Sequence, residues 1–144
     1  MMTQLELPFV SKEVWYLAHP VSGDPVGNAM RAVQWLRWLT ERDCGRIYIA
    51  PWVATVLAFS HLDLSSPGPD GQQTWVSFVE DDEEIVRRTN GILLVGGRVS
   101  PGMARECAAA VAAGLSVVDW SMHATPDTLP HGVWDDFELS GKHV

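Results

Sequence analysis

The sequence predicts an α/β fold: a single-domain, Rossmann- or flavodoxin-like three-layer sandwich around a sheet of four to five mainly parallel strands. Two observations lead to this prediction. Short apolar segments typical of buried strands alternate with segments of about 10 to 18 residues that have helical spacing. The chain has 144 residues, of which 47% are hydrophobic and 19% charged, which fits one globular domain with a sizeable core. We therefore expect one domain over residues 1–144.

The first part of the chain contains two expected strands and a long helix. After a loose leader at 1–12, the segment EVWYLA at 13–18 is typical of a short buried strand. A turn-rich stretch follows, and Asn28 is a plausible N-cap for a helix over 29–42. The segment RIYIA at 46–50 predicts a second strand. The apolar positions that recur at helical spacing in the helix are Met30, Val33, Leu36 and Trp35 or Leu39.

The middle of the chain is expected to hold two helices and a third strand. After Pro51 and Trp52, an apolar stretch through His61 is interpreted as helical, and a loop rich in proline, glycine and serine follows at 63–73. The next helix covers about 72–89, and the residues TNG at 89–91 are typical of its C-terminal end. The segment GILLV at 91–95 predicts the third strand.

The last helix has clear signals at both ends. Ser100 is expected as its N-cap, Pro101 suits its first turn, and Gly114 ends it. The segment LSVVDW at 115–120 predicts the fourth strand. The tail at 121–144 has no clear periodicity, and we expect it either to pack on the domain or to reach a second subunit.

The charge of the chain excludes some classes of partner. A formal net charge of −8 and a pI near 4.9 argue against nucleic-acid polymers and anionic membranes. The apolar runs are too short to cross a bilayer, and the first residues do not resemble a secretion signal, so we expect a cytoplasmic protein. Cys44 and Cys107 fit no metal spacing and are expected to be buried thiols.

A binding site is expected at one edge of the sheet. In folds of this kind, ligands bind outside the carboxyl ends of the strands. That edge would hold residues 19–28, 51–52 and 96–102. The last of these segments leads into a helix N-terminus, where free amides favour a phosphate or a hydroxyl-rich ligand. Ser100 is expected either to cap the helix or to contact the ligand.

Glu106 is the only acid in its alanine-rich helix. Helical geometry places it near the face of Gly102 and Met103, and the missing side chain of Gly102 leaves room for a ligand to approach the carboxylate. Two interpretations remain open. Glu106 is either a placed chemical group or a partly exposed glutamate that pairs with Arg105 or Arg98.

The acidic run EDDEE at 80–84 also has two interpretations. Asp81 and Asp82 open a helix, where acids stabilise the positive end of the dipole, and the remaining acids can form a solvated face. The histidines share no spacing typical of metal ligands, so we expect neither a metal nor a cofactor. They are His19, His61, His123, His131 and His143.

Taken in order, several segments resemble one known family. VWYLAHPVSG, the helix beginning at Asn28, the PW pair, DDEEIVRRTNGILLVGG and SPGMARECAAAVAAGLSVV are similar to the nucleoside 2-deoxyribosyltransferase-like superfamily. This family includes transferases that exchange bases on deoxyribose and 2′-deoxynucleoside 5′-phosphate N-hydrolases. It also includes many small uncharacterised bacterial and phage proteins. The resemblance covers roughly residues 13–119 and implies action on an N-glycosidic bond.

The resemblance implies a role for each matching residue. Glu106 corresponds to the nucleophilic glutamate of the family. Asp82, with Asp81 as an alternative one residue away, corresponds to the acid that helps to protonate the leaving base. Tyr16 corresponds to the phenol that orients the nucleophile, and Ser100 to a hydroxyl near the 5′ end of the sugar.

The expected substrate-binding residues surround this centre. His19 stands where the family has a glycine. In the loop where the nucleotide hydrolases carry a phosphate-binding serine and arginine, this chain has Pro20 and Ser22, and Arg98 is the residue that can compensate. Trp52 is expected either to stack on the base or to be a core aromatic. The full set comprises Ser100, Gly102, Gly97, Arg98, His19, Ser22, Asn28, Trp52 and Asp81.

We therefore expect N-glycosidic cleavage or base exchange on a nucleoside or nucleotide, by a homodimer. The base, the sugar, the need for a 5′-phosphate and the choice between hydrolysis and transfer stay open. One alternative is a catalytically silent nucleotide-binding or sensing module. Another is a phage or mobile-element accessory protein that contacts another protein through an apolar patch around the tail that carries Trp134.

Overall fold

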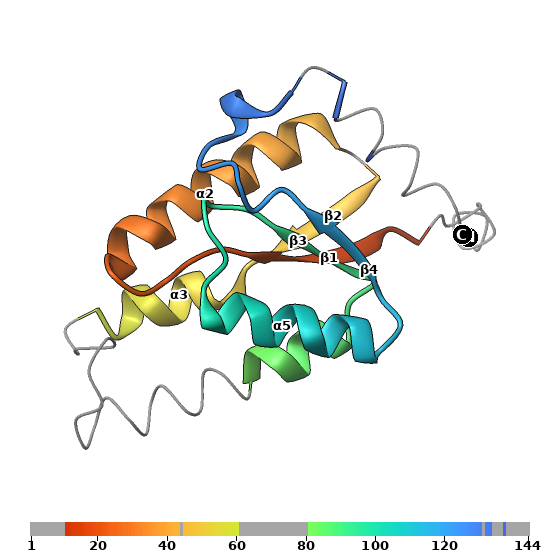
Figure 1. The fold of residues 1–144 in the computed structure, drawn as a ribbon, viewed down its shortest axis with the longest axis horizontal. Coiled ribbons are helices and arrows are strands. Elements are labelled where there is room, and N and C mark those ends of the chain that lie inside the picture. The colour runs from red at the N-terminus through yellow and green to blue at the C-terminus, as the bar shows by residue number, and fades with distance from the viewer. Residues whose placement is uncertain (1–10, 44, 61–80, 131, 134–136, 138–144) are drawn as a thin grey trace, which may run out of the picture.

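The fold is built on one parallel sheet, which confirms the predicted α/β class. The structure is a computed structural model that describes residues 11–43, 45–60, 81–130, 132–133 and 137. Within this part of the chain the sheet has four strands in the order β2-β1-β3-β4, and every neighbouring pair is parallel (Figure 1). The strands are β1 (Glu13–Ala18), β2 (Arg46–Ile49), β3 (Gly91–Leu94) and β4 (Ser116–Asp119).

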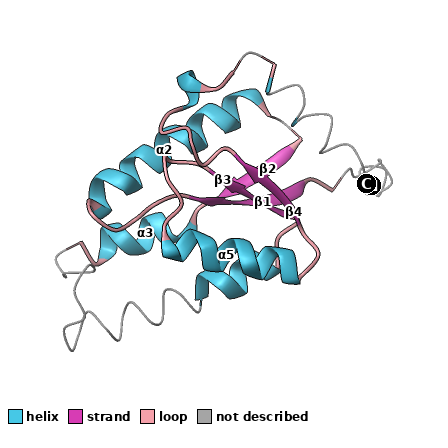
Figure 2. Cartoon of the chain, viewed as in Figure 1, coloured by secondary structure: helices cyan, strands magenta, loops and turns pink. Residues whose placement is uncertain are grey.

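The helices cover both faces of the sheet and make three layers. Helix α2 (Pro25–Arg42) lies on one side, whereas α5 (Pro101–Ala112) and the helical residues 81–87 lie on the other (Figures 1 and 2). Helix α3 (Pro51–Ala58) follows β2 directly and packs against α2. The predicted loop at 63–73 and the predicted helical residues 72–80 lie outside the described residues.

Helix α2 begins earlier than the sequence suggests, which corrects the expected N-cap. Asp24 is the N-cap, because its side chain accepts a hydrogen bond from the Gly27 amide at 3.2 Å, and Pro25 opens the helix. Asn28 is a buried residue of the first turn. Its amide group donates to the carbonyl oxygens of Val21 at 3.0 Å and Ser22 at 3.3 Å, so it fixes the loop after β1.

The buried face of α2 is also different from the predicted one. Met30 and Val33 are 51% and 39% exposed, so the prediction that they face the sheet is wrong. Ala29 and Ala32 lie at the sheet instead, because their small side chains let the helix backbone approach closely. Trp35 and Leu39 complete this face, as the sequence predicted for that pair.

The ends of α5 agree with the prediction. Ser100 is the N-cap and its hydroxyl accepts a hydrogen bond from the Met103 amide at 3.2 Å, while Pro101 occupies the first turn. The helix stops at Ala112, and Gly114 follows with a φ of +73°, which glycine adopts without a steric penalty. The flank of α5 leaves Cys107 partly exposed, so this thiol is less buried than expected; Cys44 lies outside the described residues.

The described part of the tail packs on the domain. Phe137 is 3% exposed and its ring meets Trp15 and Trp120 edge-on, with centroids 5.2 Å and 5.1 Å away. The Phe137 carbonyl accepts a hydrogen bond from Arg46 at 2.9 Å. These contacts hold Phe137 against residues of β1 and β2 and against Trp120, which follows β4, whereas Trp134 lies outside the described residues.

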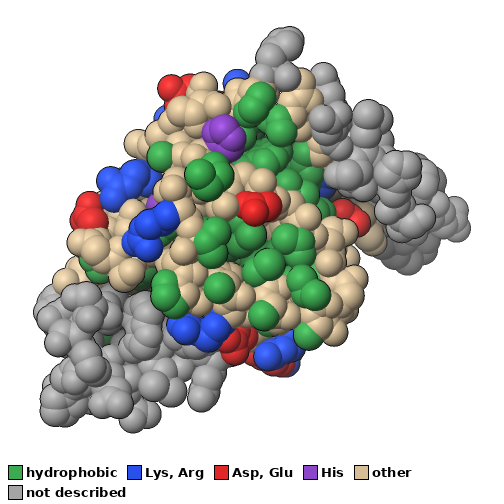
Figure 3. Space-filling view, viewed as in Figure 1, with side chains coloured by type: hydrophobic (Ala, Val, Ile, Leu, Met, Phe, Trp, Pro, Cys, Tyr) green, Lys and Arg blue, Asp and Glu red, His purple; other side chains and the backbone are tan. Residues whose placement is uncertain are grey.

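The surface carries scattered apolar side chains, and Figure 3 shows several on the face with α5 and β4. Val111 on α5, Val117 on β4 and Met122 after β4 are 64%, 37% and 80% exposed. Among the described residues, no helix has both the length and the apolar character that a membrane span requires.

Candidate active site

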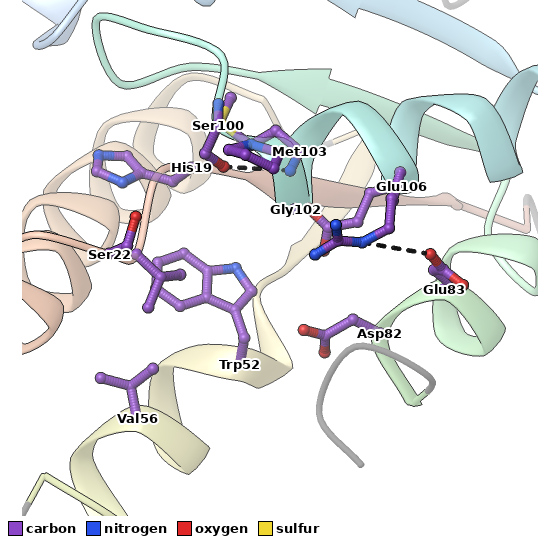
Figure 4. Close-up of a pocket in the computed structure, with 13 residues that line it drawn as sticks. His19, Ser22, Trp52, Val56, Asp82, Glu83, Ser100, Gly102, Met103 and Glu106 are labelled. Atoms are coloured by element: carbon purple, nitrogen blue, oxygen red, sulfur yellow. Dashed lines mark hydrogen bonds and ion pairs between the residues drawn. The ribbon is translucent and has the colours of Figure 1, made fainter. Parts of the chain in front are cut away.

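The topology creates a crevice at one edge of the sheet. From β1 the chain crosses to β2 on one side, whereas β3 lies on the other side of β1 and leads outward to β4. Ligands of open α/β sheets bind at such a switch point, outside the carboxyl ends of the strands. A pocket of about 320 Å³ lies there (Figure 4). Its lining consists of His19, Val21, Ser22, Trp52, Val56, Asp82, Glu83, Ser100, Pro101, Gly102, Met103, Arg105 and Glu106.

Glu106 occupies the inner wall of this pocket. It lies on the face of α5 that also buries Met103 and Ala110, and only 9% of the residue is exposed. Tyr16, a fully buried residue of β1, donates a hydrogen bond from its hydroxyl to Glu106 Oε2. The carboxyl group is therefore fixed toward the sheet, and the alternative of a solvent-exposed glutamate paired with arginine does not describe this structure.

Asp82 faces the same space from the helical residues 81–87. Figure 4 shows its carboxylate directed into the pocket, across from Glu106 and beside Trp52. Tyr16 also acts to lower the pKa of Asp82, so the phenol influences both acids. The structure thus brings together the three residues expected to form the catalytic centre.

The shared burial of these groups changes their proton affinities. Burial, together with the negative charges of Asp82 and Glu83, raises the pKa of Glu106 to about 8, although Tyr16 and Arg105 act against this rise. Burial and the charges of Asp81 and Glu83 raise the pKa of Asp82 to about 7. Burial raises the pKa of Tyr16 well above 10, so the phenol remains a hydrogen-bond donor. Between pH 7 and 8 the two acids together hold about one proton.

The start of α5 forms a second wall. The Ser100 hydroxyl caps the helix, and the Ser100 amide in turn donates to Met103 Sδ at 3.4 Å. The Ala104 amide donates to the Ser100 carbonyl, and Pro101 has no amide hydrogen. In this first turn, the Gly102 amide is therefore the one that can donate a hydrogen bond to a ligand. Capping is the role that the hydrogen bonds give Ser100, whose side chain also borders the pocket.

Two aromatic rings close the opposite side. His19 and Trp52 stack with centroids 6.1 Å apart and planes inclined by 26°. The Trp52 indole donates to the Leu17 carbonyl at 3.1 Å and is only 5% exposed, so it is a core aromatic as well as a pocket wall. The His19 Nδ1 lies 2.8 Å from the Pro20 carbonyl, and burial lowers the pKa of His19, which keeps the ring neutral at pH 7.

Four of the predicted substrate-binding residues do not line the pocket. Arg98 donates to the Ser22 carbonyl at 2.8 Å, and Asn28 donates to the same loop, so both support the segment after β1. Gly97 approaches Ala124, where a Cβ atom would lie 3.3 Å from the Ala124 Cβ. Asp81 is exposed at the start of the helical residues 81–87 and acts on the pocket through its charge on Asp82.

The sequence reasoning missed several wall residues. Val56 lies one helical turn after Trp52, and this spacing was the signal that would have found it. Glu83 and Arg105 neighbour the predicted acids Asp82 and Glu106 in the sequence, but only helix packing shows that they face the pocket. Val21, Pro101 and Met103 complete the missed set.

No group of three or more side chains suited to a metal gathers within the described residues. Comparison of the chain with protein-family models, with curated proteins and with solved structures found no match.

Proposed function

We propose that the protein cleaves the N-glycosidic bond of a nucleoside or nucleotide. The observation that carries the proposal is the hydrogen bond from Tyr16 to Glu106 at the back of a pocket that a second acid, Asp82, also faces. Two carboxyl groups around one cavity, one to attack and one to deliver a proton, are the arrangement that glycosidic cleavage uses. The resemblance of the sequence to the deoxyribosyltransferase-like superfamily supports the same reaction.

In the first step the bond between C1′ of the sugar and the base nitrogen breaks. The ionised Glu106 carboxylate forms a bond to C1′, and the bonding electron pair leaves with the base. The base takes a proton from Asp82, so the products are neutral base, a glycosyl ester of Glu106 and the Asp82 carboxylate. The Tyr16 hydroxyl holds the attacking carboxylate in a fixed direction and favours its ionised form against the effect of burial.

In the second step the ester is released. Asp82 takes a proton from a water molecule, whose oxygen bonds to C1′ while the Glu106 carboxylate leaves. The sugar is then free and both acids return to their starting states. If a second base enters in place of water, the same step transfers the sugar, so hydrolysis and exchange share one intermediate.

The test is a product assay on a panel of ribo- and deoxyribonucleosides, each with and without a 5′-phosphate. Chromatography of the wild-type reaction is expected to show free base. Glu106→Ala is expected to abolish release while the far-UV circular dichroism spectrum remains unchanged, because loss of a nucleophile costs orders of magnitude in rate. Glu41→Ala, an exposed glutamate on α2, is the matched control. Equal turnover by wild type and Glu106→Ala would contradict the proposal.

A binding module without turnover is the second candidate, and one observation favours it. With a pKa of about 8, most of the Glu106 carboxyl is protonated at pH 7, and a neutral carboxyl group is a hydrogen-bond donor and a poor nucleophile. In the same assay this candidate gives thermal stabilisation by a nucleoside or nucleotide with no free base.

We also propose that the protein works as a cytoplasmic homodimer. The exposed Val111, Val117 and Met122 support a surface that a second copy covers. Sedimentation-equilibrium analysis tests this assembly, and a monomer at all concentrations would contradict it.

A further inference from the structure

Arg105 is the one basic side chain that lines the pocket from the described residues. It precedes Glu106 on α5, and its Nε lies 3.9 Å from Glu83 Oε1, an ion pair marked by the dashed line at Glu83 in Figure 4. The Arg105 side chain is 44% exposed and that of Glu83 is 23% exposed. A partly exposed ion pair at this distance contributes little to stability, so the guanidinium is free to exchange Glu83 for another acceptor.

Arg105 lies at the end of the pocket where the leaving group belongs. Its partner Glu83 is the direct neighbour of Asp82, the proposed proton donor to the base. Gly102, one turn earlier on α5, has no side chain on this wall, and a Cβ atom there would already be in van der Waals contact with Arg105 Nη2 at 3.9 Å. Asp82 and Arg105 line the same pocket of about 320 Å³, so one bound base can contact both side chains.

The charges that line the pocket indicate what Arg105 can bind. The described walls carry three acids, Asp82, Glu83 and Glu106, against the single charge of Arg105. The leaving base gains negative charge as the glycosidic bond breaks, and the guanidinium is the group that can stabilise it. Two N–H groups of a guanidinium can donate to the two lone pairs of a 6-oxo oxygen, whereas a 6-amino group presents donors to donors.

We propose that Arg105 is a specificity-determining residue that binds a carbonyl oxygen of the leaving base and so selects 6-oxopurine nucleosides over 6-aminopurine nucleosides. This inference rests on the proposed function. Asp82 protonates the ring nitrogen on the same edge of the base, and Arg105 holds the adjacent oxygen after it leaves Glu83. A 6-aminopurine instead relies on Glu83 as an acceptor, which places no positive charge near the leaving group.

The test compares kcat/KM for inosine and adenosine, and for their deoxy forms, in the wild type and in variants. The wild type is expected to favour inosine by about 10- to 100-fold. Arg105→Met is expected to reduce this ratio to within about threefold, through slower release of hypoxanthine and not through faster release of adenine. Arg105→Lys keeps the charge without the paired geometry and should be intermediate. Glu83→Gln should keep or increase the preference, because it removes the charge that holds Arg105 and leaves a 6-amino group with a weaker acceptor.

Arg37→Met is the matched control, because Arg37 is 82% exposed on α2 and lies outside this pocket. It is expected to leave the substrate ratio at the wild-type value. A loss of the same size on both bases in Arg105→Met, or a wild-type preference for adenosine, would overturn the assignment.

If the proposed function is wrong, the wild-type protein will release no free base from any nucleoside. In that case thermal shifts with the same panel decide the role of Arg105. Stabilisation by inosine that Arg105→Met loses, with stabilisation by adenosine unchanged, would support the assignment. Equal shifts for both proteins would overturn it.

Discussion

Tyr16 and Glu106 are 90 residues apart in the sequence and are joined by a hydrogen bond from the phenol to Oε2. Tyr16 is on β1, whereas Glu106 is on the helix that follows β3, the strand next to β1. The bond therefore joins β1 to α5, the helix that follows the neighbouring strand β3. Because both residues are buried, the bond fixes the direction of the carboxyl group, and it acts to lower a pKa that burial raises to about 8.

Tyr16→Phe is expected to slow base release by about 10- to 100-fold, which corresponds to loss of one hydrogen bond to a charged group. The Tyr16 bond lowers the pKa of Glu106, so its removal raises that pKa further. The basic limb of kcat/KM against pH, which lies at the higher pKa of the pair, should then move to higher pH, and the acidic limb should follow because Tyr16 also acts to lower the pKa of Asp82. Steady-state kinetics between pH 5 and 10 measure both the rate and the limbs. An unshifted basic limb would show that the phenol has no influence on the nucleophile.

The wild-type profile itself is expected to be bell-shaped, with its maximum near pH 7.5. The reactive form has Glu106 ionised and Asp82 protonated, which is a state of the pair with one proton. This state is most populated midway between the pKa values of about 7 and about 8. The acidic limb reports loss of the carboxylate and the basic limb reports loss of the last proton. A flat profile from pH 6 to 9 would contradict this assignment.

Asp82→Asn is expected to slow release of poor leaving groups by about 100-fold or more, because the amide cannot deliver a proton. The loss should shrink for a substrate whose leaving group is a stable anion, such as the nitrophenyl glycoside of the same sugar, which releases nitrophenolate. Asp119→Asn, an acid on β4 outside the pocket, is the matched control. A loss of the same size on every leaving group would give Asp82 a structural role.

Glu106→Gln is expected to stabilise the fold at high pH. The folded pKa of about 8 lies above the ordinary value of 4.5, so the folded protein binds this proton more tightly than the unfolded chain. Stability from this group is fully present below pH 4.5 and falls as the pH rises to about 8. Glutamine does not titrate, so the variant escapes the loss, which is at most about 5 kcal/mol. Thermal unfolding at pH 3.5 and pH 9 should show equal melting temperatures for Glu106→Gln and the wild type only at pH 3.5. Glu41→Gln should match the wild type at both. A variant less stable than the wild type at pH 9 would contradict the prediction.

The sequence predicted the strands and the ends of α5 because these depend on local signals. Apolar runs mark β1 and β3, and Ser100 with Pro101 marks the start of α5. The buried face of α2 could not be predicted from side-chain size, because the closeness of the sheet selects Ala29 and Ala32 over larger residues nearby.

The candidate site was predicted unevenly for a similar reason. The catalytic set came from the family resemblance, which relates residues far apart in the sequence. The direction of Arg105 depends on how the helical residues 81–87 pack beside α5, and no local pattern in the chain encodes that packing.

Gly96 offers a test of how the pocket is built. Its φ of +116° is unfavourable for other residues, and a Cβ atom there would lie 2.4 Å from Pro20 Cδ and 2.9 Å from the His19 ring. Gly96→Ala is therefore expected to cost more than about 2 kcal/mol in the free energy of unfolding, since strain and a steric clash add. Gly114 also has a positive φ, but a Cβ atom there would meet nothing within 4 Å, so Gly114→Ala should cost only about 1 kcal/mol. Chemical denaturation measures both values.

The same pair of variants separates backbone strain from the shape of the pocket. His19 lines the pocket and stacks on Trp52, so a displaced imidazole in Gly96→Ala should also weaken nucleoside binding. Gly114→Ala lies beyond the far end of α5 and should bind as the wild type does. If both variants lose the same free energy of unfolding and bind nucleoside as the wild type does, the packing of Gly96 against Pro20 and His19 does not shape the pocket. If Gly96→Ala loses more free energy of unfolding and alone binds nucleoside more weakly, this packing holds His19 in its place in the pocket wall.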